Sequence, residues 1–98
     1  RVWKEFRFTT ETDAAEVSDA VEPGQGTVVL QGMADVVFEE KGRLYILDYK
    51  TDAADEAQLR QRYAQQLAVY ARAVAQIMGQ EVAACYIYGF HEGKTIAV

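Results

Sequence analysis

The spacing of apolar side chains changes twice along the chain, near residue 52 and again near residue 80. Before that point, residues 2–9 alternate between two sets of side chains and predict a half-buried β-strand. Residues 31–51 contain two runs of β-branched and aromatic side chains around a Lys-Gly pair, which predicts a β-hairpin. Residues 10–26 are polar and acidic and end in a turn cluster, so a surface loop is expected there, with one helical turn near residues 13–20.

After the hairpin, apolar side chains recur every three or four residues, which is the spacing of an amphipathic helix. The predicted apolar stripe contains Leu59, Tyr63, Leu67, Tyr70, Val74, Ile77 and Met78. Asp55 is a favourable N-cap because Gln58 follows it three residues later. Gly79 is a favourable terminator, so the helix is expected to end at about Met78.

Two more strands are predicted beyond the helix. Residues 82–90 form a continuous apolar run that predicts a buried strand, and residues 95–98 form a last short strand after a turn. Hairpin strands pair antiparallel, whereas a helical crossover returns the next strand parallel to the one before it. We therefore expect an α/β fold, with a mixed sheet, a central antiparallel hairpin and a long helix packed on one face.

The hairpin pattern also predicts which side chains meet across its strands. If residues 41–42 form a two-residue loop, paired residue numbers sum to 83. Asp35 would then lie across from Asp48, and Met33 across from Lys50. Residues two apart on a strand share a face, so Lys50 would point the same way as Asp48. The hairpin would gather two carboxylates and one ammonium group.

Two interpretations of this cluster stay open on the residues alone. Directly opposed carboxylates repel, because their Cβ atoms lie about 5 Å apart. A hard cation such as Mg²⁺ or Mn²⁺ would remove that cost, and a neighbouring lysine would hold or polarise a water molecule. The alternative is a solvated hairpin face on which Lys50 neutralises one aspartate, since a one-residue slip would move every side chain to the other face.

Three ordered motifs resemble a known family. Gly-Met-Ala-Asp at residues 32–35 and Leu-Asp-Tyr-Lys-Thr-Asp at residues 47–52 resemble the D…(D/E)xK core of the PD-(D/E)xK nucleases. Gln-Leu-Ala-Val-Tyr at residues 66–70 resembles the Gln-x-x-x-Tyr motif of the RecB-type branch. The whole chain outside residues 10–26 is similar to the nuclease domain that ends AddA-type helicase–nuclease subunits.

The resemblance implies a role for each residue of the hairpin motifs. It implies that Asp35, Asp48 and the backbone carbonyl of Tyr49 bind the metal, and that Lys50 positions the attacking water and helps to deprotonate it. Glu5 is a lesser metal-site candidate. Its surrounding Lys-Glu-Phe-Arg-Phe stretch loosely fits an Arg/Lys-Glu-x-x-Phe motif of RecB-type domains, without the usual proline.

The helix motif has a plainer interpretation beside the implied one. From the residues, Gln66 is an edge position with a solvated amide, and Tyr63 and Tyr70 pack in the core with their hydroxyls at its rim. The resemblance implies instead that Gln66 and Tyr70 line the site and contact a phosphate or base of the substrate.

As a whole, the resemblance implies a Mg²⁺- or Mn²⁺-dependent deoxyribonuclease, the exonuclease part of a helicase–nuclease that acts in recombination and double-strand-break repair. DNA, helicase domains on the same chain and a second helicase–nuclease subunit would be its partners. One alternative is a nuclease-fold DNA-binding or assembly module with little activity in isolation. Another is a metal-free interaction domain, which metal titration would distinguish from the first two.

Composition indicates one small globular domain over residues 1–98, in which half of the side chains are hydrophobic. The chain starts with Arg1 and a strand-like run, so it is expected to be a fragment of a longer helicase–nuclease. Its net charge of −5 argues against a generic nucleic-acid binder. However, many acidic residues gather in residues 11–22, while the helix carries basic side chains at Arg60, Arg62 and Arg72. Bound metal would add positive charge.

Cysteine content and hydropathy indicate the compartment. The single cysteine, Cys85, lies in an apolar run and is expected to be a buried thiol in a reducing compartment. The sequence shows no apolar run near 18 residues and no signal-peptide pattern, so a cytoplasmic location without a membrane partner is expected. His91 has no ligand partner at zinc spacing and is expected to be an exposed turn residue.

Overall fold

The computed structural model describes residues 1–16 and 20–98, which form one five-stranded sheet and one long helix. The elements in chain order are β1 (Val2–Asp13), the 3₁₀ turn η1 (Ala14–Glu16), β2 (Thr27–Glu40), β3 (Arg43–Lys50), α1 (Glu56–Met78), β4 (Val82–Gly89) and β5 (Lys94–Ala97). The strand order is β1-β2-β3-β4-β5. β3 and β4 are parallel, and every other neighbouring pair is antiparallel. The predicted α/β fold with a mixed sheet is confirmed.

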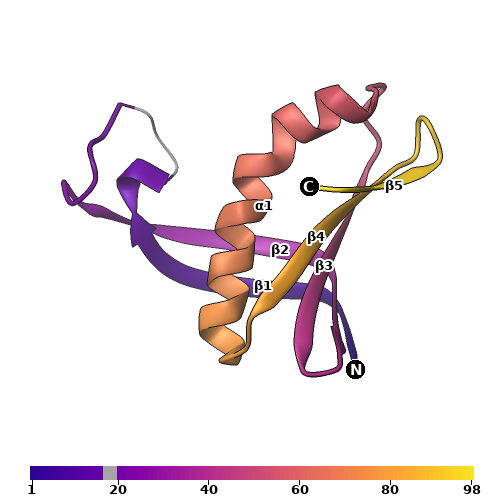
Figure 1. Cartoon of the computed structure of the whole chain (residues 1–98). Helices are drawn as coiled ribbons and strands as arrows, with labels where there is room; N and C mark the ends of the chain where they lie inside the picture. The colour runs from indigo at the N-terminus through magenta and orange to yellow at the C-terminus, as the bar shows by residue number, and fades with distance from the viewer. Residues whose placement is uncertain (17–19) are drawn as a thin grey trace.

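The helix lies across one face of the sheet and contacts β4 and β1 (Figure 1). Its start is the predicted capping box: Asp55 Oδ1 accepts from the Gln58 N–H at 2.9 Å, and Gln58 Oε1 accepts from the Asp55 N–H at 3.0 Å. Its end is Gly79, which adopts the left-handed conformation with φ 66°. The largest fully buried side chains come from β2, β3, α1 and β4, namely Val37, Leu44, Ile46, Leu67, Val74 and Ile87.

The predicted apolar stripe of the helix is wrong at Ile77, which is 49% exposed. Val69 and Ala73, which the stripe omitted, are buried. Leu30, on the N-terminal arm of β2, lines the same hollow as Val69. This arm gives the flank of the helix an apolar surface that the sequence pattern did not anticipate.

The expected surface loop at residues 10–26 is also wrong in its first part. β1 continues through Asp13, where it pairs with Thr27, and η1 supplies one helical turn after it. Asp13 then holds the turn, since its carboxylate accepts from the Ala15 N–H at 2.9 Å and the Gly24 N–H at 2.8 Å. The rest of the expected helical turn includes residues 17–19, which lie outside the described residues. The result is a long β1/β2 ribbon that extends past the helix (Figure 1).

The β1/β2 ladder is interrupted at one level, between the pairs Lys4↔Val36 and Phe6↔Ala34. Glu5 has φ 51° there, an uncommon value for a residue with a side chain. On the β2 side, Ala34 and Val37 are both buried although they are three residues apart. A regular strand alternates every two residues, so β2 changes face at Asp35, which lies between them.

The register of the hairpin follows the prediction up to that level. Its five pairs run from Glu40↔Arg43 to Val36↔Leu47, and each sums to 83. The extrapolation beyond them was wrong: neither Asp35 with Asp48 nor Met33 with Lys50 forms a ladder pair. The face change in β2 separates the two strands there.

Candidate active site

Asp35 and Asp48 replace the backbone pairing that the hairpin loses at its open end. Asp48 Oδ1 accepts from the backbone N–H of Asp35 at 3.0 Å, and Asp35 Oδ2 accepts from the backbone N–H of Tyr49 at 2.8 Å. Each carboxylate is therefore tied to the opposite strand by a hydrogen bond to its charged form. This explains how two aspartates share one site although they are not directly opposed.

This arrangement leaves each aspartate one carboxylate oxygen outside the pairing, Asp35 Oδ1 and Asp48 Oδ2. Asp48 is only 3% exposed, and the charged partner of Oδ2 is Lys50 at 3.5 Å. The N–H of Tyr49 points toward Asp35, and the carbonyl of the same residue leaves the strand on the same edge. Two carboxylate oxygens and a carbonyl fit a hard divalent cation, which in proteins often keeps several water ligands.

Glu5 lies at the same level of the sheet as Asp35, but the structure does not join it to the pair. It is exposed, and among residues 1–16 and 20–98 no three acidic, histidine or cysteine side chains gather closely enough to hold a metal. The positive φ of Glu5 marks the ladder interruption beside the site. Its role as a metal ligand stays a prediction.

Lys50 is held by groups from both the sheet and the helix. Its Nζ lies 3.5 Å from Asp48 Oδ2 and 3.5 Å from Gln66 Oε1. The same ammonium lies 4.1 Å from the centre of the Tyr63 ring, within the range of a cation–π contact. Its side chain is 17% exposed, so the charge lies at the rim of the buried cluster and remains accessible.

Gln66 connects Lys50 to Tyr70. While its amide oxygen accepts from Lys50, its amide nitrogen donates to the Tyr70 hydroxyl at 3.5 Å. Burial raises the pKa of Tyr70 above its ordinary value of 10.0, and the negative charge of Asp48 acts in the same direction. The structure thus brings the two residues of the helix motif together with Lys50, and their contact with the substrate stays a prediction.

A glycine makes room for Tyr70. A Cβ atom on Gly32 would lie 2.5 Å from Cζ of Phe8 and 3.0 Å from Cε1 of Tyr70. The two rings pack edge to face with their centres 5.0 Å apart. Gly32 is the first residue of the Gly-Met-Ala-Asp motif, so this motif supplies the space for Tyr70 as well as a carboxylate.

Sequence reasoning missed a second layer of contacts around Lys50. The Tyr63 hydroxyl donates to Asp52 Oδ2 at 2.7 Å, and Arg62 Nη1 lies 2.9 Å from the same oxygen. The hydrogen bond from Tyr63 lowers the pKa of Asp52, and that bond also raises the pKa of Tyr63. The spacing could have predicted that Tyr63 lies near Lys50, because Tyr63 precedes Gln66 by three residues and shares its helix face.

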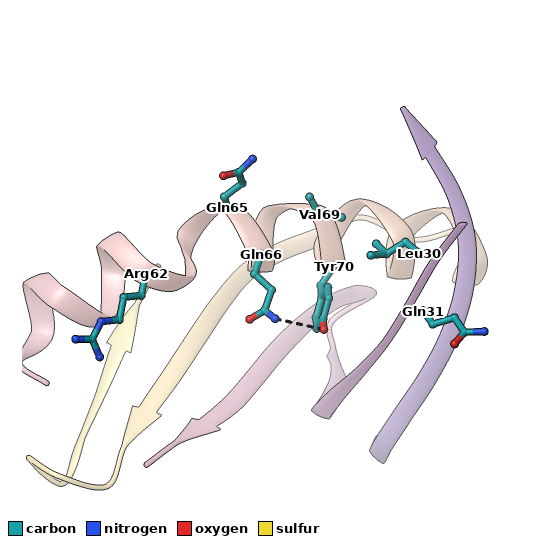
Figure 2. Close-up of a pocket in the computed structure, with 7 residues that line it drawn as sticks. All are labelled: Leu30, Gln31, Arg62, Gln65, Gln66, Val69 and Tyr70. Atoms are coloured by element: carbon teal, nitrogen blue, oxygen red, sulfur yellow. Dashed lines mark hydrogen bonds between the residues drawn. The ribbon is translucent and has the colours of Figure 1, made fainter. Parts of the chain in front are cut away.

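A hollow of about 450 Å³ opens along the flank of α1 next to this cluster (Figure 2). It is lined by Leu30 and Gln31 from β2 and by Arg62, Gln65, Gln66, Val69 and Tyr70 from α1. Gln66 and Tyr70 belong to both the hollow and the lysine cluster. Amide and guanidinium groups are suitable partners for phosphate oxygens and base edges.

The remaining sequence candidates are the cysteine and the helix arginines. Cys85 is buried, as expected, and this burial raises the pKa of its thiol to about 11. Of the three helix arginines, Arg60 is paired with Glu56 and Arg62 with Asp52. The described helices include none that is long and apolar enough to cross a membrane.

Comparison with known proteins identifies the family. The profile of the PD-(D/E)XK nuclease superfamily matches residues 1–97. An ATP-dependent helicase/nuclease subunit from Clostridium perfringens is 32% identical over 104 aligned residues, which cover 100% of this chain. The protein of the same name from Pelotomaculum thermopropionicum is 37% identical over 98% of the chain, and that from Anoxybacillus flavithermus is 44% identical over 65% of it.

These relatives are much longer proteins. The chain spans only 8% of the Clostridium perfringens and Pelotomaculum thermopropionicum proteins, and 6% of the Anoxybacillus flavithermus protein. The superfamily match, in contrast, covers nearly the whole chain, including all three motifs around the aspartate pair. The chain therefore belongs to the PD-(D/E)XK nuclease superfamily.

Proposed function

We propose that this chain is the nuclease domain of an AddA-type ATP-dependent helicase/nuclease, in which it hydrolyses DNA phosphodiester bonds. The observation that carries the proposal is the cluster of Asp35, Asp48 and Lys50 at the open end of the hairpin, with Gln66 of α1 against the lysine. The superfamily membership supports a hydrolytic nuclease, and the relatives support the attachment to a helicase.

Mg²⁺ or Mn²⁺ is the proposed cofactor, with Asp35, Asp48 and the Tyr49 carbonyl as ligands. When bound, such an ion lowers the pKa of a water molecule and stabilises negative charge on phosphate oxygens. Lys50, whose Nζ lies 3.5 Å from Asp48 Oδ2, would hold the attacking water beside that carboxylate and help to remove its proton. Electrostatic stabilisation of this kind requires donors fixed before the reaction.

The helix supplies the proposed contacts to DNA. Gln66 and Tyr70 present an amide and a hydroxyl where the hollow meets the lysine cluster (Figure 2). We propose that they orient a phosphate or base next to the scissile bond. Only interactions that strengthen in the transition state raise kcat, so their removal should affect turnover if they contact the reacting phosphate.

In the wider assembly, we propose that the domain is the exonuclease part of a recombination and double-strand-break repair machine. Helicase domains on the same chain would deliver DNA to it, and a second helicase–nuclease subunit would complete the machine. The names of the relatives support the helicase link. Degradation of linear DNA but not of closed circular DNA by the complete protein would test the exonuclease assignment.

A second candidate is a nuclease-fold module that binds DNA or assembles with other domains without cleaving. The observation in its favour is that Lys50 already neutralises part of the Asp48 charge, while Glu5 remains outside the site. A metal-free interaction domain is a further candidate on the same grounds. Cleavage assays and metal titration distinguish these candidates.

The deciding experiment is a cleavage assay of the complete protein with Mg²⁺ or Mn²⁺. Asp48→Asn keeps an oxygen that accepts from the Asp35 N–H, so it removes the charge with little change in shape. We expect Asp48→Asn and Lys50→Ala each to abolish cleavage while ATP hydrolysis continues. Glu40→Gln, at the exposed end of the hairpin, is the matched control and should cleave normally. Undiminished cleavage by either folded site variant would remove the nuclease assignment.

A further inference from the structure

Lys50 lacks a strong direct anchor, although its proposed role requires a fixed position. A lysine carries its charge on a flexible stem with several rotatable bonds. The contacts of Nζ with Asp48 and Gln66 are both 3.5 Å, which is long for a charge-assisted hydrogen bond. The remaining described contact is with the face of the Tyr63 ring at 4.1 Å.

The Tyr63 ring is in turn held in place at its far end. Its hydroxyl donates a 2.7 Å hydrogen bond to Asp52 Oδ2, and Arg62 pairs with the same oxygen at 2.9 Å. The backbone of Asp52 is also fixed, because its carbonyl accepts from the Ala54 N–H at 2.9 Å. A hydrogen bond to a carboxylate pushes electron density into the phenol ring, which strengthens the attraction of the ring for a cation.

Lys50 is the last residue of β3, and Asp52 lies in the connection between β3 and α1. Asp52 follows Lys50 by two residues, whereas Tyr63 lies 11 residues further along, on the helix. The end of β3 therefore provides the cation, and the connection that follows provides the group that orients the ring beneath it. The contacts thus run from Lys50 at the end of β3 to Tyr63 on α1, and from Tyr63 back to Asp52 in the connection.

We propose that Tyr63 and Asp52 form a positioning pair that holds the Lys50 ammonium beside Asp48. The inference rests on the proposed nuclease function of Lys50. Tyr63 would act through the face of its ring, and Asp52 would act by fixing the orientation of that ring. Neither residue would contact the reacting phosphate.

The test compares Tyr63→Leu, which removes the ring, with Tyr63→Phe, which keeps the ring and loses only the bond to Asp52. In the complete protein we expect Tyr63→Leu to lower kcat for DNA cleavage about tenfold or more, with KM changed less than about twofold. Tyr63→Phe should retain most of the kcat. Tyr86→Leu is the matched control, because Tyr86 is a half-buried tyrosine on the opposite face of the sheet and stacks on Tyr45.

A spectroscopic measurement reports the contact without using activity. After reductive methylation with ¹³C-formaldehyde, the methyl groups on Lys50 should resonate upfield because they lie over the face of the Tyr63 ring. The signal is assigned by its loss in Lys50→Arg. It should keep its shift in Tyr63→Phe and return to the ordinary lysine position in Tyr63→Leu.

Three results would overturn the proposal. The first is a wild-type kcat in folded Tyr63→Leu, and the second is an unchanged Lys50 methyl shift in that variant. The third is equal loss in Tyr63→Phe and Tyr63→Leu that follows their melting temperatures, which would make Tyr63 only structural. Lys50→Ala distinguishes this failure from a failure of the nuclease assignment. If Lys50→Ala is inactive while Tyr63→Leu cleaves normally, only the positioning pair is rejected. If Lys50→Ala also cleaves normally, the nuclease assignment is rejected.

Discussion

The backbone N–H of Asp35 donates a 3.0 Å hydrogen bond to Oδ1 of Asp48, and the Asp35 carboxylate reaches across in return to the N–H of Tyr49 at 2.8 Å. The two aspartates thus act as the last connections between β2 and β3. Each carboxylate accepts a hydrogen bond from the opposite strand and also carries a negative charge close to the other carboxylate. The hydrogen bond and the charge therefore contribute separately to the stability of the fold.

Substitutions of Asp35 separate these two contributions. Asp35→Asn keeps an acceptor for the Tyr49 N–H and removes one of two neighbouring negative charges, so the free energy of unfolding should stay unchanged or rise by up to about 1 kcal/mol. Asp35→Ala loses the acceptor and should be less stable than the asparagine variant by about 1 kcal/mol. Urea unfolding without metal measures both. Equal stability of the two variants would contradict the reciprocal bonding.

Metal binding should be visible as thermal stabilisation. A ligand that binds only the folded state stabilises it by about 2.7 kcal/mol at 100 times its Kd. We therefore expect Mn²⁺ to raise the melting temperature of the wild type, and to raise that of Asp48→Asn much less. Glu40→Gln, in which an exposed carboxylate outside the site is removed, should respond like the wild type. Identical shifts in all three proteins would indicate nonspecific binding.

Gln66 and Leu67 are adjacent in α1 but should have opposite effects. If Gln66 contacts the substrate, Gln66→Ala should lower cleavage at least about tenfold, which is about 1.4 kcal/mol of transition-state stabilisation, with little change in melting temperature. Leu67 is 1% exposed, so Leu67→Ala should cost about 2–5 kcal/mol of stability. Tyr70→Phe should lie between, because it keeps the ring and loses the hydroxyl.

Cleavage corrected for the folded fraction, together with melting curves, distinguishes these effects. A Gln66→Ala protein that melts early but cleaves normally would make this glutamine structural. The hairpin residues would then remain as the candidate site.

Gly32 should not tolerate even one additional carbon. The Cβ of Gly32→Ala would lie 2.5 Å from Phe8 Cζ, so one of the two rings must move. We expect a loss of about 1–3 kcal/mol in stability from overpacking. Displacement of Tyr70 should also reduce cleavage. Thr9→Ala, at the exposed position next to Phe8, is the control and should be close to wild type in urea unfolding. A fully stable Gly32→Ala would show that the ring pair has room to adjust.

The Cys85 thiol gives a pH dependence with a defined sign. Its pKa is raised from 9.0 to about 11, chiefly by burial, so the folded state holds the proton more tightly than the unfolded state. The resulting stability is complete below pH 9 and is lost as the pH rises toward 11. Over that window the wild type should lose up to about 2–3 kcal/mol more than Cys85→Ala. Parallel stability curves in urea would show that the thiol is not buried.

The predictable parts of the fold are those with a local signal. The Lys41-Gly42 turn fixed the hairpin register through Val36↔Leu47, and Asp55 with Gly79 marked both ends of the helix. The interruption of the β1/β2 ladder at Glu5 had no such signal, because a glutamate in the sequence does not predict a positive φ. Asp35 lies at the level of that interruption, so its neighbours could be predicted from the motifs, whereas its hydrogen bond with the Tyr49 N–H could not.

The contacts around the lysine show the same limit. Gln66 and Tyr70 were recognisable from their spacing, whereas Tyr63 resembled any aromatic residue on an apolar stripe. Its bond to Asp52 depends on how the β3–α1 connection folds back toward the first turns of the helix. Likewise, the burial of Val69 and the exposure of Ile77 depend on tertiary packing, which the residue pattern of the helix does not contain.

The two halves of the candidate site rest on different supports. The carboxylates are held by hydrogen bonds between β2 and β3, whereas Gln66 and the Tyr63 ring, which contact the Lys50 ammonium, belong to α1. A small displacement of the helix would therefore move Gln66 and the Tyr63 ring relative to the lysine while the acidic pair kept its spacing. If the proposed function is correct, a displacement of α1 would change the rate of DNA cleavage more than the affinity of the acidic pair for a cation.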